Sequence, residues 1–273
     1  MPLTPSETKN LLDRLGHRPD KRLGQNFLID GNLVRKSLSM AKLPERTEVV
    51  EVGPGLGSLT GALLDEGHQV HAVELDETLS EHLKKTFAEE MENGSFTLAM
   101  GDAVKMPFGK LPDESSKFHI VANLPYAISS PWLEAILSSQ RLPQRLVLML
   151  QKESADRYRA KAGSKNFGAL SIFLAACYEN VDTHSVSRRC FHPVPAVDSV
   201  LLRLDKLPQP FLFPDHTRSL IRSLFTRRRK QLASSAKSEK KESCERIFRW
   251  LEKEGIPGKL RPEQVEAEKW KIL

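Results

Sequence analysis

The sequence predicts an α/β fold with a mostly parallel sheet, followed by a small C-terminal domain that is entirely helical. Apolar runs with the length of buried strands alternate with helical segments, an order that implies right-handed crossovers between parallel strands. These runs occupy residues 47–52, 69–74, 96–100, 118–122 and 145–151. From Asp215 onward the pattern is helical, with no candidate strand.

The chain length supports this organisation. Its 273 residues suffice for one large domain, or for a domain plus a smaller one. Prolines interrupt the pattern at Leu207-Pro-Gln-Pro210, and we expect the domain boundary there. The expected domains are therefore residues 1–206, which would bind a ligand and carry the chemistry, and residues 207–273. A last strand, 200–204, is expected to close the sheet in an antiparallel hairpin.

Composition narrows the possible classes of function. The net charge of +6 and the pI near 9.2 favour a polyanionic partner. The histidines show no metal-ligand spacing such as HExxH, so we expect no metal. We find no signal-type segment and no run of about 20 apolar residues, and the three cysteines form no CxxC pair. We therefore expect a cytoplasmic protein with reduced thiols and no membrane contact.

A glycine-rich turn is the first candidate ligand site. Gly53-Pro-Gly55-Leu-Gly57 follows the first strand directly, and Glu74 ends the second strand 21 positions later (74 − 53). This order is typical of dinucleotide or nucleoside binding, in which the acid accepts hydrogen bonds from ribose hydroxyls. The glycine spacing departs from the G-x-G-x-x-G pattern that suits a pyrophosphate. It therefore favours S-adenosylmethionine over NAD as the ligand.

A second acidic residue follows the third strand, within Gly101-Asp102-Ala103. In a nucleoside site the Asp102 carboxylate can accept a hydrogen bond from the adenine amino group. A Gly-Asp pair after a strand is equally typical of an ordinary turn. The sequence leaves both interpretations open.

The tetrapeptide Asn123-Leu124-Pro125-Tyr126 follows a buried strand, where open α/β sheets bind their ligands. An exocyclic amino group on a planar ring is a poor nucleophile, because its lone pair is delocalised. Two acceptors aimed at its hydrogens, the Asn123 side chain and the Leu124 main-chain carbonyl, would disperse the charge that develops. Pro125 favours an extended backbone at Leu124, and Tyr126 offers a ring for base stacking. The alternative is an ordinary Asn-x-Pro turn.

Two cationic segments and one aromatic residue are candidates for nucleic-acid contacts. The segments are Lys21-Arg22 and Arg227-Arg228-Arg229-Lys230, and phosphate contacts there would make binding depend steeply on salt. A solvated turn and a solvated helix face are the alternatives. Phe191 opens the proline-punctuated loop that ends at Ser199. It either covers an edge of the core or serves as a platform for a base.

Together these motifs resemble the ribosomal RNA adenine dimethylases. The resemblance runs from about Lys21 to about Leu232, and seven motifs occur in the family's order: Lys21–Asp30, Glu51–Thr60, Gly101–Ala103, Asn123–Tyr126, Gln151–Glu153, Gly163–Lys165 and Phe191–Ser199. It implies a Rossmann-like class I S-adenosylmethionine-dependent methyltransferase. The implied reaction places methyl groups on N6 of two adjacent adenosines in the 3′-terminal hairpin of small-subunit (16S-type) rRNA, giving N6,N6-dimethyladenosine.

The resemblance also implies roles for individual residues. The implied cofactor contacts are Asn26, Leu28, Gly53, Gly55, Glu74, Leu75, Asp102, Ala103 and Asn123. Asn123 and Leu124 would accept from the adenine N6, and Pro125 would shape their turn. Tyr126 and Phe191 would stack on a target base that has left its helical stack. From their charge we expect RNA contacts at Lys21, Arg22, Arg227, Arg228, Arg229 and Lys230, with residues 207–273 as the RNA-binding domain.

The chain departs from the family pattern at two positions. Ala127 stands where the family often has Asn, and Ala196 stands where the proline loop often carries a cation, so a phosphate contact is expected to be missing. We expect a monomer that acts on rRNA within a pre-30S-type particle. The alternatives are a large-subunit rRNA adenine methylase of the antibiotic-resistance type and a non-catalytic RNA-binding assembly factor. An NAD-dependent enzyme is a more distant alternative.

Overall fold

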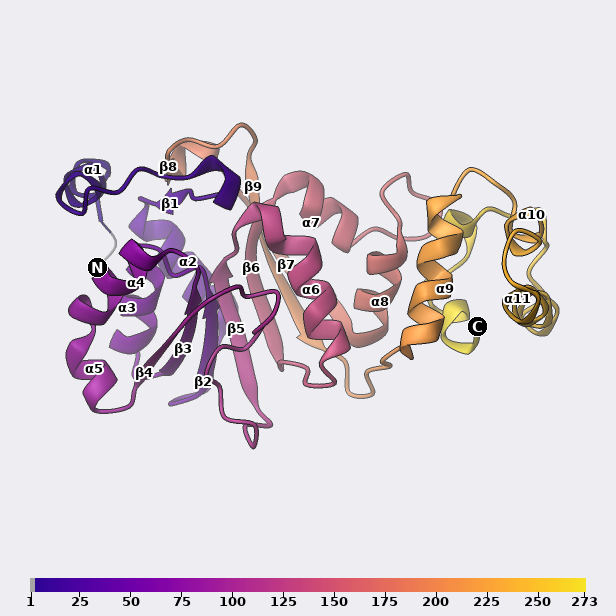
Figure 1. The fold of residues 1–273 in the computed structure, drawn as a ribbon, viewed down its shortest axis with the longest axis horizontal. Helices are drawn as coiled ribbons and strands as arrows, with labels where there is room; N and C mark the ends of the chain where they lie inside the picture. The colour runs from indigo at the N-terminus through magenta and orange to yellow at the C-terminus, as the bar shows by residue number, and fades with distance from the viewer. Residues whose placement is uncertain (1–2) are drawn as a thin grey trace. The chain divides into compact units, whose positions relative to one another are not determined.

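The computed structural model describes residues 3–273, apart from the side chain of Lys21. The chain forms two compact units (Figure 1). The first contains the chain through Ser154 together with Asn180–Lys206, and the second contains Ala155–Glu179 together with Leu207–Leu273. The expected division at residue 207 is therefore incomplete, because residues 155–179 group with the C-terminal part of the chain.

The reason for this difference is the apolar helix α8, Ala169–Cys177. Most of its residues are buried, so the helix needs an apolar partner on nearly every side. It contacts α9, Asp215–Thr226, and the 3-10 segment η5, Ala267–Ile272. The Phe173 and Phe213 rings lie 5.3 Å apart between centroids. Packing against elements that are distant in sequence thus places α8 in the second unit.

The first unit is built on a seven-stranded sheet with the order β4-β3-β2-β5-β6-β9-β7. The strands are β2 (Glu48–Val52), β3 (Gln69–Glu74), β4 (Phe96–Met100), β5 (Phe118–Asn123), β6 (Arg145–Gln151), β7 (Tyr178–Val186) and β9 (Ser199–Lys206). Strands β2 to β6 pair in parallel, and β9 is antiparallel to β6. The mostly parallel α/β sheet predicted from the sequence is confirmed.

A second, two-stranded sheet pairs β1 (Phe27–Leu28) with β8 (Phe191–His192). Figure 1 shows this pair beyond one end of the larger sheet. Two residues are too few to show the alternation that indicates a strand, so the sequence did not predict either one. The pair ties the segment after residue 20 to the start of the proline loop.

The helices follow the predicted order. In the first unit they are α1 (Pro5–Arg14), α2 (Gly31–Ala41), α3 (Ser58–Asp65), α4 (Glu77–Thr86), α5 (Ala88–Glu92) and α6 (Ser129–Ser138), and α7 (Lys152–Tyr158) continues into the second. Phe87 separates α4 from α5, as the C-cap of the first and the N-cap of the second. Gly57 occupies the N-cap position of α3 with φ 81°.

The second unit is helical beyond residue 207, as predicted. It contains α8 and α9, then α10 (Leu232–Ala236), α11 (Lys241–Lys253), η4 (Pro262–Gln264) and η5. The region 262–271 is 3-10 rather than α-helical. Within the described part of the chain, no helix has the length and apolar character needed to cross a membrane.

The core of the first unit lies on both faces of the sheet. In β6 the residues Leu146 to Leu150 are all buried, as expected for a strand that helices cover on both sides. An ion cluster closes the amino end of β6, where Asp205 accepts from Arg145 at 2.7 Å and from Arg203 at 2.6 Å. Arg203 also donates to the carbonyl oxygen of Met40, so the cluster holds the end of α2 against the sheet.

Candidate active site

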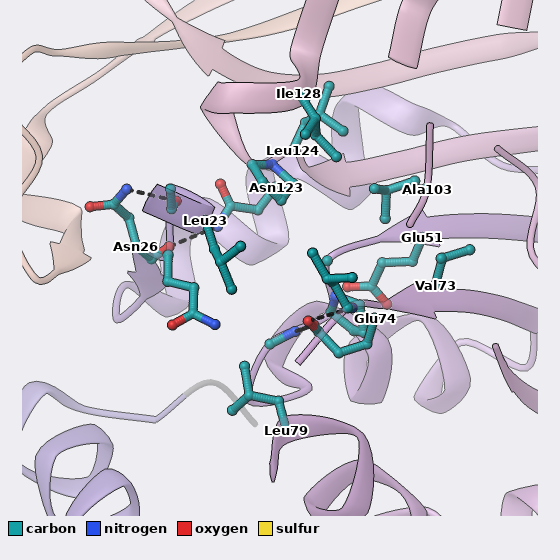
Figure 2. Close-up of a pocket in the computed structure, with 18 of the residues that line it drawn as sticks. Leu23, Asn26, Glu51, Val73, Glu74, Leu79, Ala103, Asn123, Leu124 and Ile128 are labelled. Atoms are coloured by element: carbon teal, nitrogen blue, oxygen red, sulfur yellow. Dashed lines mark hydrogen bonds between the residues drawn. The ribbon is translucent and has the colours of Figure 1, made fainter. Parts of the chain in front are cut away.

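A pocket opens at the carboxyl ends of the central strands of the first unit. Its walls are the segment Arg22–Leu28, the glycine loop after β2, the ends of β3 and β4, and the turn Asn123–Ile128. Figure 2 shows Asn26 and Asn123 on one side of this pocket and Glu51 and Glu74 on another. The structure thus gathers motifs that are about 100 residues apart in sequence, at the edge where doubly wound sheets bind ligands.

Gly53 lets the glycine loop approach the Asn123–Tyr126 turn closely. Its φ is 65°, and an added Cβ would lie 2.8 Å from Cγ of Pro125. Its N–H donates to the carbonyl oxygen of Val73 at 2.9 Å, which fixes the loop to β3. Only glycine meets both requirements without strain. The sequence predicted close approach to a ligand, and the structure adds a close approach to Pro125.

Glu74, at the end of β3, carries a carboxylate held by backbone donors. Its Oε2 accepts from Gly55 N at 3.1 Å, and its Oε1 accepts from the backbone of Leu75 at 2.9 Å and of Asp76 at 3.0 Å. Burial raises the pKa of Glu74, and these three N–H donors oppose that rise. The carboxylate therefore has a fixed orientation at the position expected for a ribose contact.

Glu51 also lines the pocket, and the sequence interpretation had not singled it out. It is 2% exposed, and its Oε2 accepts from Thr60 Oγ1 at 2.6 Å. Burial raises the pKa of Glu51 to about 8, opposed by the Thr60 bond and assisted by the charge of Glu74. The group is therefore mostly protonated at neutral pH. An acid within the apolar run Val49–Val52 was the signal that could have identified it.

The orientation of the Asn123 amide follows from its partner. Its Nδ2 donates to the carbonyl oxygen of Asn26 at 3.1 Å. Since a carbonyl oxygen can only accept, the amide nitrogen must face Asn26 and Oδ1 must face the other way. Within the described residues, Oδ1 has no hydrogen-bond partner. The side-chain acceptor is thus available for a ligand.

The rest of the tetrapeptide forms a short, well-anchored turn. Leu124 is 1% exposed, so its side chain anchors the turn in the core. Pro125 has φ −56° and ψ 123° and precedes a 3-10 turn at Tyr126–Ile128. The Tyr126 hydroxyl lies 2.6 Å from Ser199 Oγ. Burial raises the pKa of Tyr126, so its ring stays neutral and half-buried at the pocket wall.

Asp102 makes the expected turn contact and also lies in the pocket wall. Its Oδ1 accepts from Val104 N at 2.9 Å, which is the ordinary turn interpretation. The residue also lines the pocket, as do its neighbour Ala103 and the apolar residues Leu28 and Leu75. Leu75 is 53% exposed, unusual for leucine, and so presents an apolar surface beside Glu74.

Gln25 is a further pocket residue that the sequence interpretation missed. Its Oε1 accepts from Asp20 N at 2.8 Å and lies 3.1 Å from His17 Nε2. Its Nε2 donates to Asp76 Oδ2 at 3.1 Å. One amide therefore connects the segment before β1 to the N-cap of α4. No sequence signal indicated this contact, because its partner lies 51 residues away.

The expected role of Phe191 in base stacking is wrong for this structure. Its side chain is 0% exposed and belongs to the hydrophobic core. Phe191 pairs with Leu28 in the β1–β8 ladder, and this pairing points the ring into the core. Phe191 therefore covers an edge of the core, which is the other interpretation that the sequence allowed.

The cationic run of the second unit divides into two pairs. Arg227 donates to Glu239 at 3.0 Å and Arg228 to Glu263 at 2.7 Å. Arg229 and Lys230 are exposed and form no ion pair with a described residue. Arg22, in the first unit, is bound to Asp20 at 2.8 Å. The expected contact at Lys21 falls on the side chain that the structure does not describe.

The pocket fits S-adenosylmethionine better than a dinucleotide. Glu74 and Asp102 line it beside Glu51, which is mostly protonated, and Arg22 is the one Lys or Arg among the described lining residues. An acidic pocket repels a pyrophosphate, whereas it tolerates the positively charged sulfonium and ammonium groups of the methyl donor. The glycine loop, Glu74 at the position of a ribose contact and the free Asn123 acceptor are the other features expected of a site for this methyl donor. Fold and pocket together define a class I S-adenosylmethionine-dependent methyltransferase.

Comparisons with known proteins identify the family. Residues 16–270 match the family model for ribosomal RNA adenine dimethylase. A ribosomal RNA small subunit methyltransferase A from Opitutus terrae is 48% identical, over 100% of this chain and 98% of that protein. Its counterpart from Clostridium acetobutylicum is 35% identical over 96% and 95%. The chain belongs to the ribosomal RNA adenine dimethylase family, and S-adenosylmethionine is its methyl donor.

Solved structures agree on the fold. The crystal structure of a dimethyladenosine transferase from Plasmodium falciparum has a TM-score of 0.73 and 26% identity, covering 90% of this chain and 95% of that one. The 23S rRNA methyltransferase ErmE has a TM-score of 0.63 at 24% identity, over 90% and 96%. At that identity the second likeness concerns the fold alone. The enzyme class expected from the sequence is confirmed.

Proposed function

We propose that this enzyme methylates N6 of two adjacent adenosines in the 3′-terminal hairpin of small-subunit rRNA, giving N6,N6-dimethyladenosine. The observation that supports this reaction best is the Asn123 side chain, whose Oδ1 is left free by the bond from Nδ2 to Asn26. The choice of the small subunit follows the names of relatives that match the chain over nearly its full length.

The residues of the turn hold and orient the target amino group. Asn123 Oδ1 and the main-chain carbonyl of Leu124 accept the two N6 hydrogens, which directs the nitrogen lone pair away from them. The Tyr126 ring stacks on the extruded base. Phe191 takes no part, because its ring is in the core. Catalysis is therefore mainly positioning and exclusion of water.

The cofactor side of the pocket is formed by the glycine loop and the acids. Glu74 would accept from the ribose hydroxyls, Asp102 from the adenine amino group, and Leu75 would contact the adenine face. When bound, S-adenosylmethionine supplies the methyl group on a positively charged sulfur. No histidine lies among the described lining residues. None is required, because the amino nitrogen becomes acidic as it is methylated and can release its proton to water.

We further propose that the enzyme is a cytoplasmic monomer that acts on a pre-30S-type particle. Its pI near 9.2 suits an RNA partner, and its three cysteines are free, as is usual in a reducing compartment. The second unit would add phosphate contacts through Arg229 and Lys230, which have no ion-pair partner among the described residues.

Primer extension on both rRNAs tests the substrate assignment. The purified protein is incubated with S-adenosylmethionine and unmethylated small- or large-subunit rRNA, with Asn123→Ala as the control for catalysis. We expect two adjacent stops near the 3′ end of the small-subunit rRNA and none with the control. A stop on the large-subunit rRNA alone would instead favour the antibiotic-resistance type of methylase. Binding of RNA without any binding of S-adenosylmethionine would favour the assembly factor.

A further inference from the structure

The proposed function leaves two exposed arginines of the first unit unused. Arg188 and Arg189 lie in the 3-10 turn Arg188–Cys190, between β7 and β8. Neither guanidinium forms an ion pair with a carboxylate in the described part of the chain. An anionic partner can bind favourably at two adjacent cations that have no counterion.

Arg188 is held in a defined position rather than extended into solvent. Its guanidinium Nη1 donates to the carbonyl oxygen of Ala196 at 3.1 Å, and its backbone N–H donates to Asp198 Oδ1 at 3.0 Å. Ser187 Oγ accepts from Arg189 N at 3.3 Å and caps the turn. A guanidinium that is already oriented loses little conformational entropy when it binds a phosphate.

The turn is joined at both ends to walls of the pocket. On one side, Cys190 O accepts from Ile29 N at 3.0 Å, and Phe191 pairs with the pocket residue Leu28. On the other side, the proline loop ends at Ser199, whose hydroxyl lies 2.6 Å from that of the pocket residue Tyr126. The two arginines therefore lie on a segment that is linked by hydrogen bonds and strand pairing to the pocket wall, including the proposed base-stacking residue Tyr126.

The chemistry of the surroundings favours a phosphate over other anions. Arginine presents several N–H donors in a fixed planar arrangement that matches phosphate oxygens. The nearby acid Asp198 accepts from the backbone N–H of Arg188 and forms no ion pair with either guanidinium group.

We propose that Arg188 and Arg189 bind phosphate groups of the RNA strand beside the target adenosine and so position that nucleotide over the pocket. The proposal rests on the proposed RNA substrate and adds a contact surface to it. It also bears on the departure at Ala196, since the Arg188 guanidinium reaches the backbone of that residue from elsewhere in the chain. The missing cation of the loop is thereby replaced.

The test compares two double variants that remove the same charge. Arg188→Gln/Arg189→Gln changes the proposed contact. Arg46→Gln/Lys117→Gln changes two exposed cations that precede β2 and β5, at the amino ends of strands whose carboxyl ends form the pocket. Affinity for a 3′-terminal fragment of small-subunit rRNA is measured from 50 to 300 mM salt. Calorimetry gives the dissociation constant for S-adenosylmethionine, and melting temperatures monitor the fold.

We expect Arg188→Gln/Arg189→Gln to reduce the slope of log affinity against log salt by about 1.4–1.8, as for two lost phosphate contacts. Cofactor affinity and melting temperature should match wild type, and the control pair should keep the wild-type slope. An unchanged slope in Arg188→Gln/Arg189→Gln, or an equal reduction in the control, overturns the proposal. If wild type binds and methylates the RNA in that case, the proposed function stands while this inference fails.

The single variant Arg189→Gln separates binding from folding. Its side chain forms no hydrogen bond with a described residue, so its replacement leaves the loop bonds of Arg188 intact. We expect a slope reduced by about 0.7–0.9 at an unchanged melting temperature. A wild-type slope in this variant would overturn its part in the contact, even if the double variant were destabilised.

Discussion

The amide nitrogen of Asn123 donates to the main-chain carbonyl oxygen of Asn26, 97 residues earlier in the chain, at 3.1 Å. This bond fixes which end of the amide faces the pocket, and it uses the backbone rather than the side chain of Asn26. The side chain of Asn26 is bound locally, to Gly24 O at 3.0 Å. Catalysis should therefore depend on the Asn123 side chain itself.

We predict that Asn123→Ala lowers kcat by about 10²–10³, the usual effect of losing one group that stabilises developing charge. Cofactor affinity should change by much less, because the lost acceptor acts mainly in the transition state. Single-turnover methylation and calorimetry measure the two quantities. Asn26→Ala, compared at saturating S-adenosylmethionine, is the matched control: it keeps the carbonyl that orients Asn123, and as an implied cofactor contact it should change cofactor affinity rather than kcat. A kcat for Asn123→Ala near the wild-type value would refute this role.

Replacing Glu51 should change how stability depends on pH. Burial raises the pKa of Glu51 from 4.5 to about 8, so the folded protein keeps a proton that the unfolded chain loses near pH 4.5. The free energy of unfolding therefore falls as pH rises between those values, by an amount on the order of 4 kcal/mol. Glu51→Gln is neutral in both states and should lack this fall. Without ligand, its gain in melting temperature over wild type should grow from pH 5 to pH 8. Parallel pH profiles for the two proteins would contradict the assignment.

Gly53→Ala should disturb the pocket more than an alanine at another left-handed glycine. At Gly53 the new Cβ would lie 2.8 Å from Pro125, whereas at Gly67, with φ 80°, it would meet nothing within 4 Å. Both changes impose backbone strain of roughly 1–2 kcal/mol, but only Gly53→Ala must also displace the Asn123–Tyr126 turn. We expect it to weaken S-adenosylmethionine binding, measured by calorimetry, while Gly67→Ala leaves binding unchanged. Equal cofactor affinities in the two variants would show that the turn tolerates the contact.

The cationic run of the second unit should separate into RNA contacts and structural ion pairs. Arg229→Gln/Lys230→Gln should reduce the salt slope of RNA binding by about 1.4–1.8 without lowering the melting temperature. Arg227→Gln/Arg228→Gln should lower the melting temperature, since Glu239 and Glu263 lose their partners. Salt titrations and thermal unfolding distinguish these effects. If both double variants changed the slope equally and neither affected stability, the division would be wrong.

Much of the fold followed from local patterns. The runs that became β3, β4 and β6 match their predicted ranges, because buried parallel strands are almost wholly apolar and end at turn residues. The predictions that failed depended on packing between segments that are far apart in the sequence. The burial of α8 against η5 moved residues 155–179 into the second unit. No pattern within 155–179 could reveal a partner nearly 100 residues further on.

The site was predictable in its motifs but not in its internal contacts. Asn123, Glu74 and Asp102 reach one pocket because the carboxyl ends of parallel strands share an edge. The sequence left burial and base stacking both open for Phe191, since the choice depends on the two-residue β1–β8 ladder. The ion pair of Arg228 could not be predicted from the sequence either, because its partner lies 35 positions away.

The most direct test of the central claim is mass mapping of rRNA nucleosides from cells with and without this protein. We predict that N6,N6-dimethyladenosine at two adjacent positions near the 3′ end of small-subunit rRNA disappears when the protein is absent. It should return with the wild-type protein but not with Asn123→Ala. Dimethyladenosine that persists at both positions without the protein would contradict the account.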